Sequence, residues 1–339
     1  MVDLIEKLIR REDLTADEAE RAMREVMEGR VSTPQLTAFL STLVMKGEHP
    51  AELVGLARTM RAHAVKLSRP AGEVFDTCGT GGDRSGTFNI SSAAALVVAA
   101  CGVKVAKHGN RSVSSRCGSA DVFEALGVNV SAVPAVVERC LNDAGIAFFF
   151  APTFHPSMKH AGPARKELGF RTTFNLLGPL TNPAGATRQI VGVPKPELTG
   201  LMANALRLLG TTRAWVVHGA DGIDEISTAG HTKVAECRDG RVHTFYIHPA
   251  EFGLSKSGAG QLGGGDAQTN AGIVRDVLSG KKGAARDVVL LNAGAGLLVA
   301  GAVHSVKEGI ARAAQAIDSR AALSTLERMV SASRAEAVP

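Results

Sequence analysis

The chain has 339 residues, of which 45% are hydrophobic and 21% are charged, so it is long enough for a large core and too apolar to be intrinsically disordered. Its formal net charge of +5 includes no block of like charge longer than two residues, which argues against nucleic acid as a partner. Five scattered cysteines without a Cys-x-x-Cys pair argue against a disulfide framework or a zinc site. They favour a reducing compartment, so we expect a cytoplasmic protein.

The first 66 residues show only helical periodicity, with apolar residues at i, i+3 and i+4 spacing in successive stretches. Thr15 with Glu18 three positions later predicts a capping box, and Gly47 stands where a helix is expected to end. The charged N-terminus is not typical of a signal peptide. The longest apolar run, residues 288–303, is short for a membrane span and contains an asparagine. We expect an N-terminal group of helices and no contact with a membrane.

From Glu73 onward, short β-rich runs alternate with helix-like segments, which predicts a mainly parallel sheet with crossover helices. A later pair of strands is expected to form a hairpin around Asp239–Gly240. The predicted fold class is therefore α/β, with a small all-helical domain and a larger domain whose central, mainly parallel sheet is flanked by helices. Ligands of open α/β sheets bind beyond the carboxyl ends of the strands, so the loops after Phe75, Val105 and His218 matter most.

A glycine-rich stretch, DTCGTGGDRSGTFNISS, lies between a predicted strand and a helix that starts near Asn89. Glycines let backbone N–H groups converge on an oxyanion, and a helix N-terminus adds further donors. The stretch is not a P-loop, because no lysine follows, and it is not a dinucleotide fingerprint, because Arg84 replaces the last glycine. The pattern predicts a phosphate or pyrophosphate site, although an ordinary glycine-rich turn has the same composition.

A second candidate anion site follows the next predicted strand. That strand is expected to deliver Lys107, His108, Asn110 and Arg111 to its carboxyl end, with several serines after them and a helix beginning near Ser119. A solvated basic loop is the alternative for this stretch taken alone. One ligand with two phosphate groups would account for both loops at once.

Two adjacent carboxylates, Asp224 and Glu225, follow a later predicted strand. Next to phosphate groups, the natural partner of such a pair is Mg²⁺, which takes few protein carboxylates and keeps water and phosphate oxygens as its other ligands. An ordinary acidic turn is the alternative.

Residues 154–183 are rich in His, Arg and Lys but have helical spacing. Arg165 could form a bidentate pair with a substrate carboxylate, and His155 and His160 could flank an aromatic ligand. A helical face that crosses between domains is the alternative. Residues 260–270 are also glycine-rich, but no basic residue accompanies them, so we expect a flexible connection there.

Taken together, GTGGD, NIS, KHGNR, GSAD, FNLLGPLTNP and DEIS, in this order and at these spacings, resemble the anthranilate phosphoribosyltransferase family. The likeness runs over nearly the whole chain. The family belongs to a group shared with nucleoside phosphorylases, which usually carry a different sequence after the lysine. This chain departs from the family pattern at Ser92, where threonine is frequent, and at Cys117, where another small residue is frequent.

The resemblance implies that the chain transfers the phosphoribosyl group of 5-phosphoribosyl 1-pyrophosphate to the amine of anthranilate, the second step of tryptophan biosynthesis from chorismate. It implies a helical, dimer-forming domain of residues 1–70 plus about 165–187. The α/β domain would comprise residues 71–164 plus 188–339 and would bind the donor and Mg²⁺. The implied assembly is a homodimer, with an association with anthranilate synthase as a further partner.

The resemblance also implies roles for individual residues. Anthranilate would contact Gly79, Asn110, His155 and Arg165, and the metal would contact Ser91, Asp224 and Glu225. No residue is a certain catalytic group, and transition-state stabilisation would come from Gly79, Lys107 and Asp83. The phosphoribosyl donor would contact the two loops at Gly79, Gly82, Asp83, Thr87, Asn89, Ile90, Ser91, Ser92, Lys107, His108, Gly109, Asn110, Arg111, Ser112, Val113, Ser114, Ser115 and Ser119.

Two other functions remain open from the sequence. A nucleoside phosphorylase would use phosphate and a nucleoside in place of a pyrophosphorylated ribose. A regulator with the same fold would lack the acidic pair or carry an altered KHGNR sequence, whereas both are intact in this chain.

Overall fold

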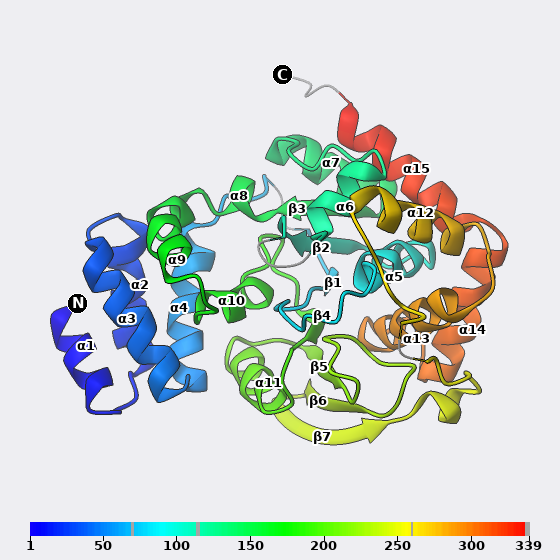
Figure 1. Cartoon of the computed structure of the whole chain (residues 1–339). Coiled ribbons are helices and arrows are strands. Elements are labelled where there is room, and N and C mark those ends of the chain that lie inside the picture. Colours follow the sequence, from blue (N-terminus) through cyan, green and yellow to red (C-terminus); the bar gives the residue numbers. More distant parts are fainter. Residues whose placement is uncertain (69–70, 113–115, 259, 336–339) are drawn as a thin grey trace.

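The computed structural model describes residues 1–68, 71–112, 116–258 and 260–335 (Figure 1). The chain begins with four helices, α1 (Val2–Ile9), α2 (Ala16–Met27), α3 (Thr33–Lys46) and α4 (Pro50–His63). Thr15 and Glu18 form the predicted capping box of α2, and Gly47 ends α3 with a φ of 87°. The apolar faces of these helices bury a shared core, so the predicted helical bundle is confirmed.

The remaining chain builds one seven-stranded sheet with the order β3-β2-β1-β4-β5-β6-β7. The first five of these strands run parallel, and β6 and β7 add an antiparallel hairpin that turns at Asp239–Gly240. Both turn residues have positive φ, as a type I′ hairpin requires. The strands are β1 (Phe75–Thr77), β2 (Val105–Gly109), β3 (Ile146–Phe150), β4 (Arg188–Gly192), β5 (Arg213–Gly219), β6 (Thr232–Arg238) and β7 (Arg241–Ile247).

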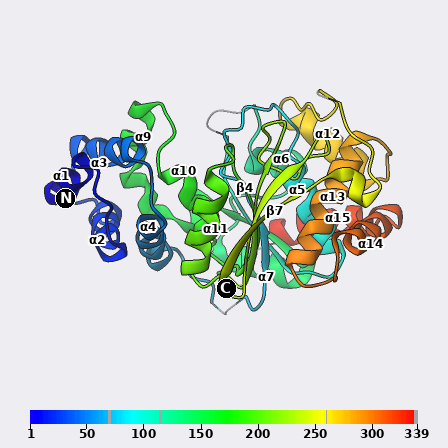
Figure 2. The same cartoon turned by 90° about the horizontal axis from the view of Figure 1, so that it is seen from below.

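Helices cover both faces of the sheet. Alternate strand residues point to opposite faces, so Ile190 packs with one core and Val191 with the other. Figure 2 shows α11 on the side that faces the N-terminal helices and α5, α13 and α15 on the other side. These helices are α5 (Ile90–Ala100), α6 (Ser119–Ala125), α7 (Pro134–Ala144), α11 (Leu198–Leu208), α12 (Ala267–Leu278), α13 (Ala284–Val299), α14 (Val306–Asp318) and α15 (Ala321–Arg334). The predicted fold class is confirmed.

A middle segment of the chain returns to the N-terminal helices. It contains α8 (Ala151–Phe154), α9 (Gly162–Leu168) and α10 (Phe174–Leu177), with short 3-10 turns at Pro156–His160 and Gly178–Leu180. Helix α9 packs on α3, and α10 packs on α4. The exact division into two domains stays a prediction.

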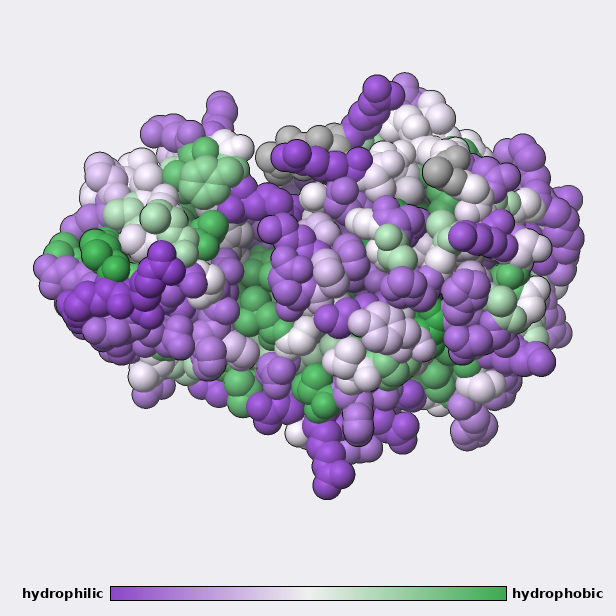
Figure 3. Space-filling view, turned by 60° about the horizontal axis from the view of Figure 1, so that its bottom comes forward, coloured by the Kyte–Doolittle hydropathy of each residue, from purple (hydrophilic) through white to green (hydrophobic). Residues whose placement is uncertain are grey.

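The face of the molecule seen in Figure 3 is largely polar, with apolar patches at the end formed by the N-terminal helices. Several of the exposed large apolar side chains belong to this end, namely Val2 and Ile9 on α1, Val44 and Met45 on α3, and Phe170 after α9. Within the described residues, no helix combines the length and the apolar character that crossing a bilayer requires.

Candidate active site

A cavity of about 820 Å³ opens at the carboxyl ends of the parallel strands. The strand order places β1 between β2 and β4, so the chain leaves β1 in one direction along the sheet and later continues in the other. Such a switch point leaves a crevice where ligands bind. The loops after β1, β2 and β5 line the cavity on the side of the sheet, and residues 151–181 line it on the side of the N-terminal helices.

The first part of the glycine-rich loop after β1 is anchored to β4 and to the acidic pair. The amides of Cys78 and Thr80 donate to the carbonyls of Ile190 and Gly192, and the Gly81 amide donates to the Asp224 carboxylate at 3.0 Å. Among the described residues, the amide of Gly82 has no hydrogen-bond partner. The loop therefore offers backbone donors to an anion, as the sequence predicted.

The absence of side chains in this loop is required by its surroundings. A Cβ on Gly79 would lie 2.6 Å from Oδ2 of Asp224, so the bare backbone lets the carboxylate approach the loop. Gly82 has a φ of +83°, which glycine adopts without strain.

The acidic pair lies against this loop. The Ser91 amide donates to Glu225 Oε1 at 3.0 Å, and the Asp224 amide donates to the Asp83 carboxylate at 3.4 Å. Burial raises the pKa of Asp224 to about 7 and that of Glu225 to about 8, and the negative charges nearby add to both shifts. In the described part of the chain, neither carboxylate forms an ion pair. The nearby charges of Arg171 and Lys107 oppose these shifts but do not offset the effect of burial.

These residues fit Mg²⁺. Two carboxylates held together by burial, with the bare glycine backbone beside them, form a hard oxygen site that a divalent cation would stabilise. The residues that would hold it are Asp224 and Glu225, with Ser91 next to Glu225.

Strand β2 delivers Lys107 and His108 to the cavity, as predicted. Lys107 is buried, with 2% of its surface exposed, and it lines the cavity beside the glycine-rich loop. Behind it, Asp76 is fully buried and accepts bonds from the His108 amide at 3.1 Å and from the Asn182 side chain at 2.8 Å. Burial raises the pKa of Asp76 to about 6, although the neighbouring Lys107 opposes the rise. Asp76 thus fixes the ends of β1 and β2 relative to each other.

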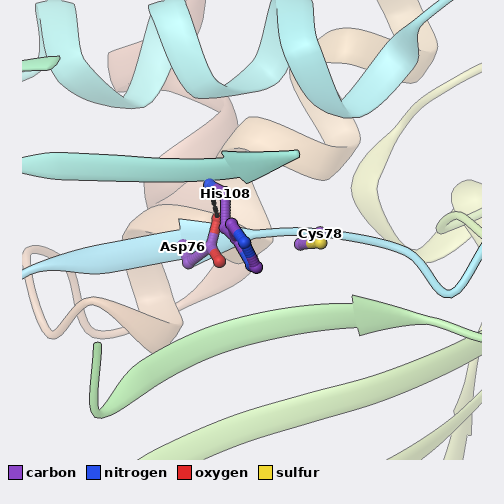
Figure 4. Close-up of side chains that lie close together, drawn as sticks. All are labelled: Asp76, Cys78 and His108. Carbon is purple, nitrogen blue, oxygen red and sulfur yellow. Dashed lines mark hydrogen bonds between the residues drawn. The ribbon is translucent and has the colours of Figure 1, made fainter. Parts of the chain in front are cut away.

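Possible ligand atoms of Asp76, Cys78 and His108 lie within 4.8 Å of one another (Figure 4). Both carboxylate oxygens of Asp76 already accept hydrogen bonds from protein groups. Burial raises the pKa of the Cys78 thiol to about 12, so the thiolate that a metal would need is unfavourable. These three residues therefore support the loop and do not form a second metal centre.

The other end of the cavity is less polar. The rings of His108 and His155 lie 5.4 Å apart, and burial lowers their pKa values to about 3 and about 4, so both are neutral. In each ring, Nε2 has no hydrogen-bond partner among the residues that the structure describes. Arg165 on α9 lies over the ring of Phe174 at 5.2 Å and forms no ion pair with any described residue. This end offers a cation and neutral rings, which suits an aromatic carboxylate.

Acidification is expected to destabilise the fold through His155. The unfolded imidazole gains a proton near pH 6.5, whereas the folded one stays neutral down to about pH 4. The stability that the neutral ring permits is therefore present above pH 6.5 and lost as the pH falls toward 4. When the pH is lowered from about 7 to about 5, the unfolding free energy of a His155→Gln variant should decrease less than that of the parent. The difference should reach about 2 kcal/mol and is measured by urea denaturation. Parallel pH profiles for the two proteins would contradict this.

Other predicted donor contacts meet at the same cavity. Asn89 occupies the N-cap position of α5, and its side-chain oxygen accepts a hydrogen bond from Asn270, while Thr87 forms an isolated β-bridge with Gly263. The Ser119 hydroxyl lies against Gly109, where a Cβ would lie 2.1 Å from it. The predicted residues that line the cavity are Gly79, Gly82, Asp83, Thr87, Asn89, Ile90, Ser91, Lys107, His108, Gly109, Asn110, Arg111, Ser112, Ser119, His155, Arg165, Asp224 and Glu225.

Some predicted residues lie outside this group or have other partners. Ser92 is fully buried outside the lining, and the Arg111 guanidinium is engaged by Asp121 and Glu124. Ile90 lines the cavity, but its side chain is in the core. Val113, Ser114 and Ser115 lie outside the described residues. The binding roles of these residues and of those that line the cavity stay predictions, as does the role of His160, which does not line the cavity.

The interpretation of residues 260–270 as a flexible connection is wrong. The Phe88 amide donates to the Leu262 carbonyl, and the Gly264 amide donates to the Gly86 carbonyl, so this segment braces the glycine-rich loop. Asn270 on α12 reaches Asn89 at 2.9 Å. No local signal could have revealed these contacts, because they join residues more than 170 positions apart.

Two family models match the chain. One, described as the helical bundle domain of a glycosyl transferase family, matches residues 2–64, and the other, described as the a/b domain of that family, matches residues 71–323. The fold and the cavity thus define the class of protein, a glycosyl transferase made of a helical bundle and an α/β domain.

The relatives narrow this class. An anthranilate phosphoribosyltransferase from Desulfatibacillum aliphaticivorans is 50% identical over 328 residues, 97% of each chain. The crystal structure of the enzyme of that name from Thermus thermophilus is 44% identical, with a TM-score of 0.91 over 98% of this chain and 99% of the other. The Saccharomyces cerevisiae enzyme in complex with PRPP and Mg is 28% identical, with a TM-score of 0.88 over 98% and 97%. The chain belongs to the anthranilate phosphoribosyltransferase family.

Proposed function

We propose that the chain transfers the phosphoribosyl group of 5-phosphoribosyl 1-pyrophosphate to the amine of anthranilate, giving N-(5-phosphoribosyl)anthranilate and pyrophosphate. This is the second step of tryptophan biosynthesis from chorismate. The observation that carries the proposal is a single cavity with unlike ends. One end has glycine amides, Lys107 and the acidic pair, and the other has neutral histidine rings and Arg165.

The donor binds at the polar end. Its pyrophosphate accepts hydrogen bonds from the free amides of the glycine-rich loop, and Lys107 neutralises part of its charge. Breaking the bond between C1 and pyrophosphate leaves negative charge on the leaving group, so groups that stabilise this charge lower the barrier. Mg²⁺ held by Asp224, Glu225 and Ser91 would supply further charge stabilisation when bound.

Anthranilate binds at the other end, with its carboxylate on Arg165 and its ring near His155 and Asn110. Its amine is neutral and needs to be positioned near C1 more than it needs to be activated. The depressed pKa of His108, at about 3, makes this imidazole a weak base. We therefore assign no general base and attribute the rate to positioning and charge stabilisation.

The wider context of the enzyme is part of the same proposal. We place it in the cytoplasm, as a homodimer in which the exposed apolar side chains of α1 and α3 meet their counterparts. The helical domain, residues 1–70 plus about 165–187, carries this interface, and the rest of the chain carries the donor site. An association with anthranilate synthase would deliver the acceptor.

The direct test mixes the purified protein with anthranilate, 5-phosphoribosyl 1-pyrophosphate and Mg²⁺ and follows the loss of anthranilate fluorescence. Signal loss that requires all three components supports the proposal. Turnover of a nucleoside with phosphate, and none of anthranilate, would favour a nucleoside phosphorylase instead.

Replacement of Arg165 by Ala should weaken anthranilate binding far more than donor binding. The guanidinium is half-buried at the apolar end and has no protein counter-ion in the described part of the chain, so its loss removes a charge-assisted bond to the carboxylate. We expect the KM for anthranilate to rise by about 10- to 100-fold, which corresponds to roughly 1.5–3 kcal/mol. Lys166→Ala, an exposed cation on the same helix, is the control. Equal losses for the two substrates would refute the role of Arg165.

A further inference from the structure

Arg171 received no role from the sequence, yet its side chain reaches the glycine-rich loop. It lies between α9 and α10, in the segment that carries Arg165, and it lines the cavity while half-buried. Its Nη2 donates to the Thr80 carbonyl at 2.9 Å. Thus a residue on the acceptor side of the cavity contacts the backbone of the donor side.

The guanidinium also rests on Gly82. A Cβ at Gly82 would lie 1.9 Å from Nη1 of Arg171 and 3.1 Å from its Cδ, so the contact exists only because this position has no side chain. Gly82 therefore has two structural requirements, a positive φ and room for Arg171.

The other anchors of the loop lie on the opposite side. Cys78 and Thr80 bond through their amides to β4, and Gly81 bonds to Asp224. Arg171 supplies the side-chain contact from the helical side, and the carboxylates of Asp83 and Asp224 lie near its charge. Arg171 forms no ion pair with either carboxylate among the described residues. It is attached to the loop backbone through Thr80.

We infer that Arg171 is a positioning residue that fastens the phosphate-binding loop to the acceptor-binding segment. The inference rests on the proposed function and adds a residue to it. A loop with three glycines and Arg84 at positive φ is costly to order, so a contact that limits its freedom prepares it for the donor. The same contact holds the two halves of the cavity at a fixed separation.

The test compares Arg171→Ala with Arg171→Lys and with the control Lys166→Ala. Arg171→Ala should raise the KM for 5-phosphoribosyl 1-pyrophosphate by about tenfold or more and change the KM for anthranilate by less than about threefold. Arg171→Lys should recover part of the loss, because its ammonium can still donate to Thr80. Guanidinium ion added at about 50 mM should partly restore Arg171→Ala and should not affect Lys166→Ala.

Unchanged donor KM in Arg171→Ala would overturn the inference. So would equal losses for both substrates together with a lower melting temperature and no rescue by guanidinium, since these indicate general structural support. Failure of this inference can be distinguished from failure of the proposed function, because in the second case the parent protein itself would show no turnover of the donor. A second readout is the cycle with Gly82→Ala. The free-energy cost of Gly82→Ala should be smaller in the Arg171→Ala background, because the guanidinium that the new Cβ would meet is gone. Additive costs of the two substitutions would contradict the contact.

Discussion

The double replacement of Asp224 by Asn and Glu225 by Gln should lower kcat/KM by about 10²- to 10³-fold at millimolar Mg²⁺ and raise the Mg²⁺ concentration needed for half-maximal rate. Both changes keep the size of the side chain and remove the negative charge that would hold the cation near the leaving group. Activity is measured by anthranilate fluorescence over a Mg²⁺ titration. Asp239→Asn, an exposed acid in the β6–β7 turn, is the control.

In the absence of metal, the same double variant should be at least as stable as the parent. Burial raises the pKa of Asp224 to about 7 and that of Glu225 to about 8, against about 4 in an unfolded chain, and the charge of Asp83 adds to the first shift and that of Asp224 to the second. The folded state therefore holds protons that the unfolded state has lost, and these groups make stability fall as the pH rises from about 4 to 8. The side-chain amides of the double variant do not titrate, so they cause no such loss of stability. An unchanged Mg²⁺ titration, or a large loss of metal-free stability at about pH 8.5, would contradict this account of the pair.

Replacement of Lys107 by Met should lower kcat/KM by about 10²-fold or more while the KM for anthranilate changes little. Lys107 is buried at the middle of β2 and lines the cavity, so its charge acts on the leaving pyrophosphate through little intervening solvent. Methionine keeps much of the volume and removes the charge. The measurement is steady-state kinetics with each substrate varied in turn.

Lys104 is a matched control for Lys107. It lies just before the same strand, and its side chain is exposed and bonded to Asn142. Lys104→Met should retain parental kinetics. A Lys107→Met enzyme with parental kcat/KM, or one in which only the KM for anthranilate changes, would remove Lys107 from the donor site.

The features that the sequence predicted are those with local causes. The capping box of Thr15 and Glu18 and the turn at Asp239–Gly240 follow from neighbouring residues, and the structure contains both. Lys107 and Asp224 line the same cavity, as a general property of parallel sheets predicts, because the carboxyl ends of the strands share one edge.

The features that the sequence did not reveal depend on long-range contacts. Asn182 supports Asp76 from 106 positions away, and Asn270 supports Asn89 from 181 positions away. The residue types give no hint of these pairs, because asparagine can bond to many partners and its sequence neighbours do not show which one it reaches in the fold. Arg171 was missed for the same reason, since its contact with Thr80 spans 91 positions.

A crystal structure of the protein with 5-phosphoribosyl 1-pyrophosphate and Mg²⁺ would examine the core of this account most directly. We expect the diphosphate to accept hydrogen bonds from the glycine-rich loop and from Lys107. We expect a cation about 2.1 Å from oxygens of the diphosphate, joined to Asp224 and Glu225 directly or through water. Donor density elsewhere, with the cavity at the carboxyl ends of the parallel strands empty, would contradict the account.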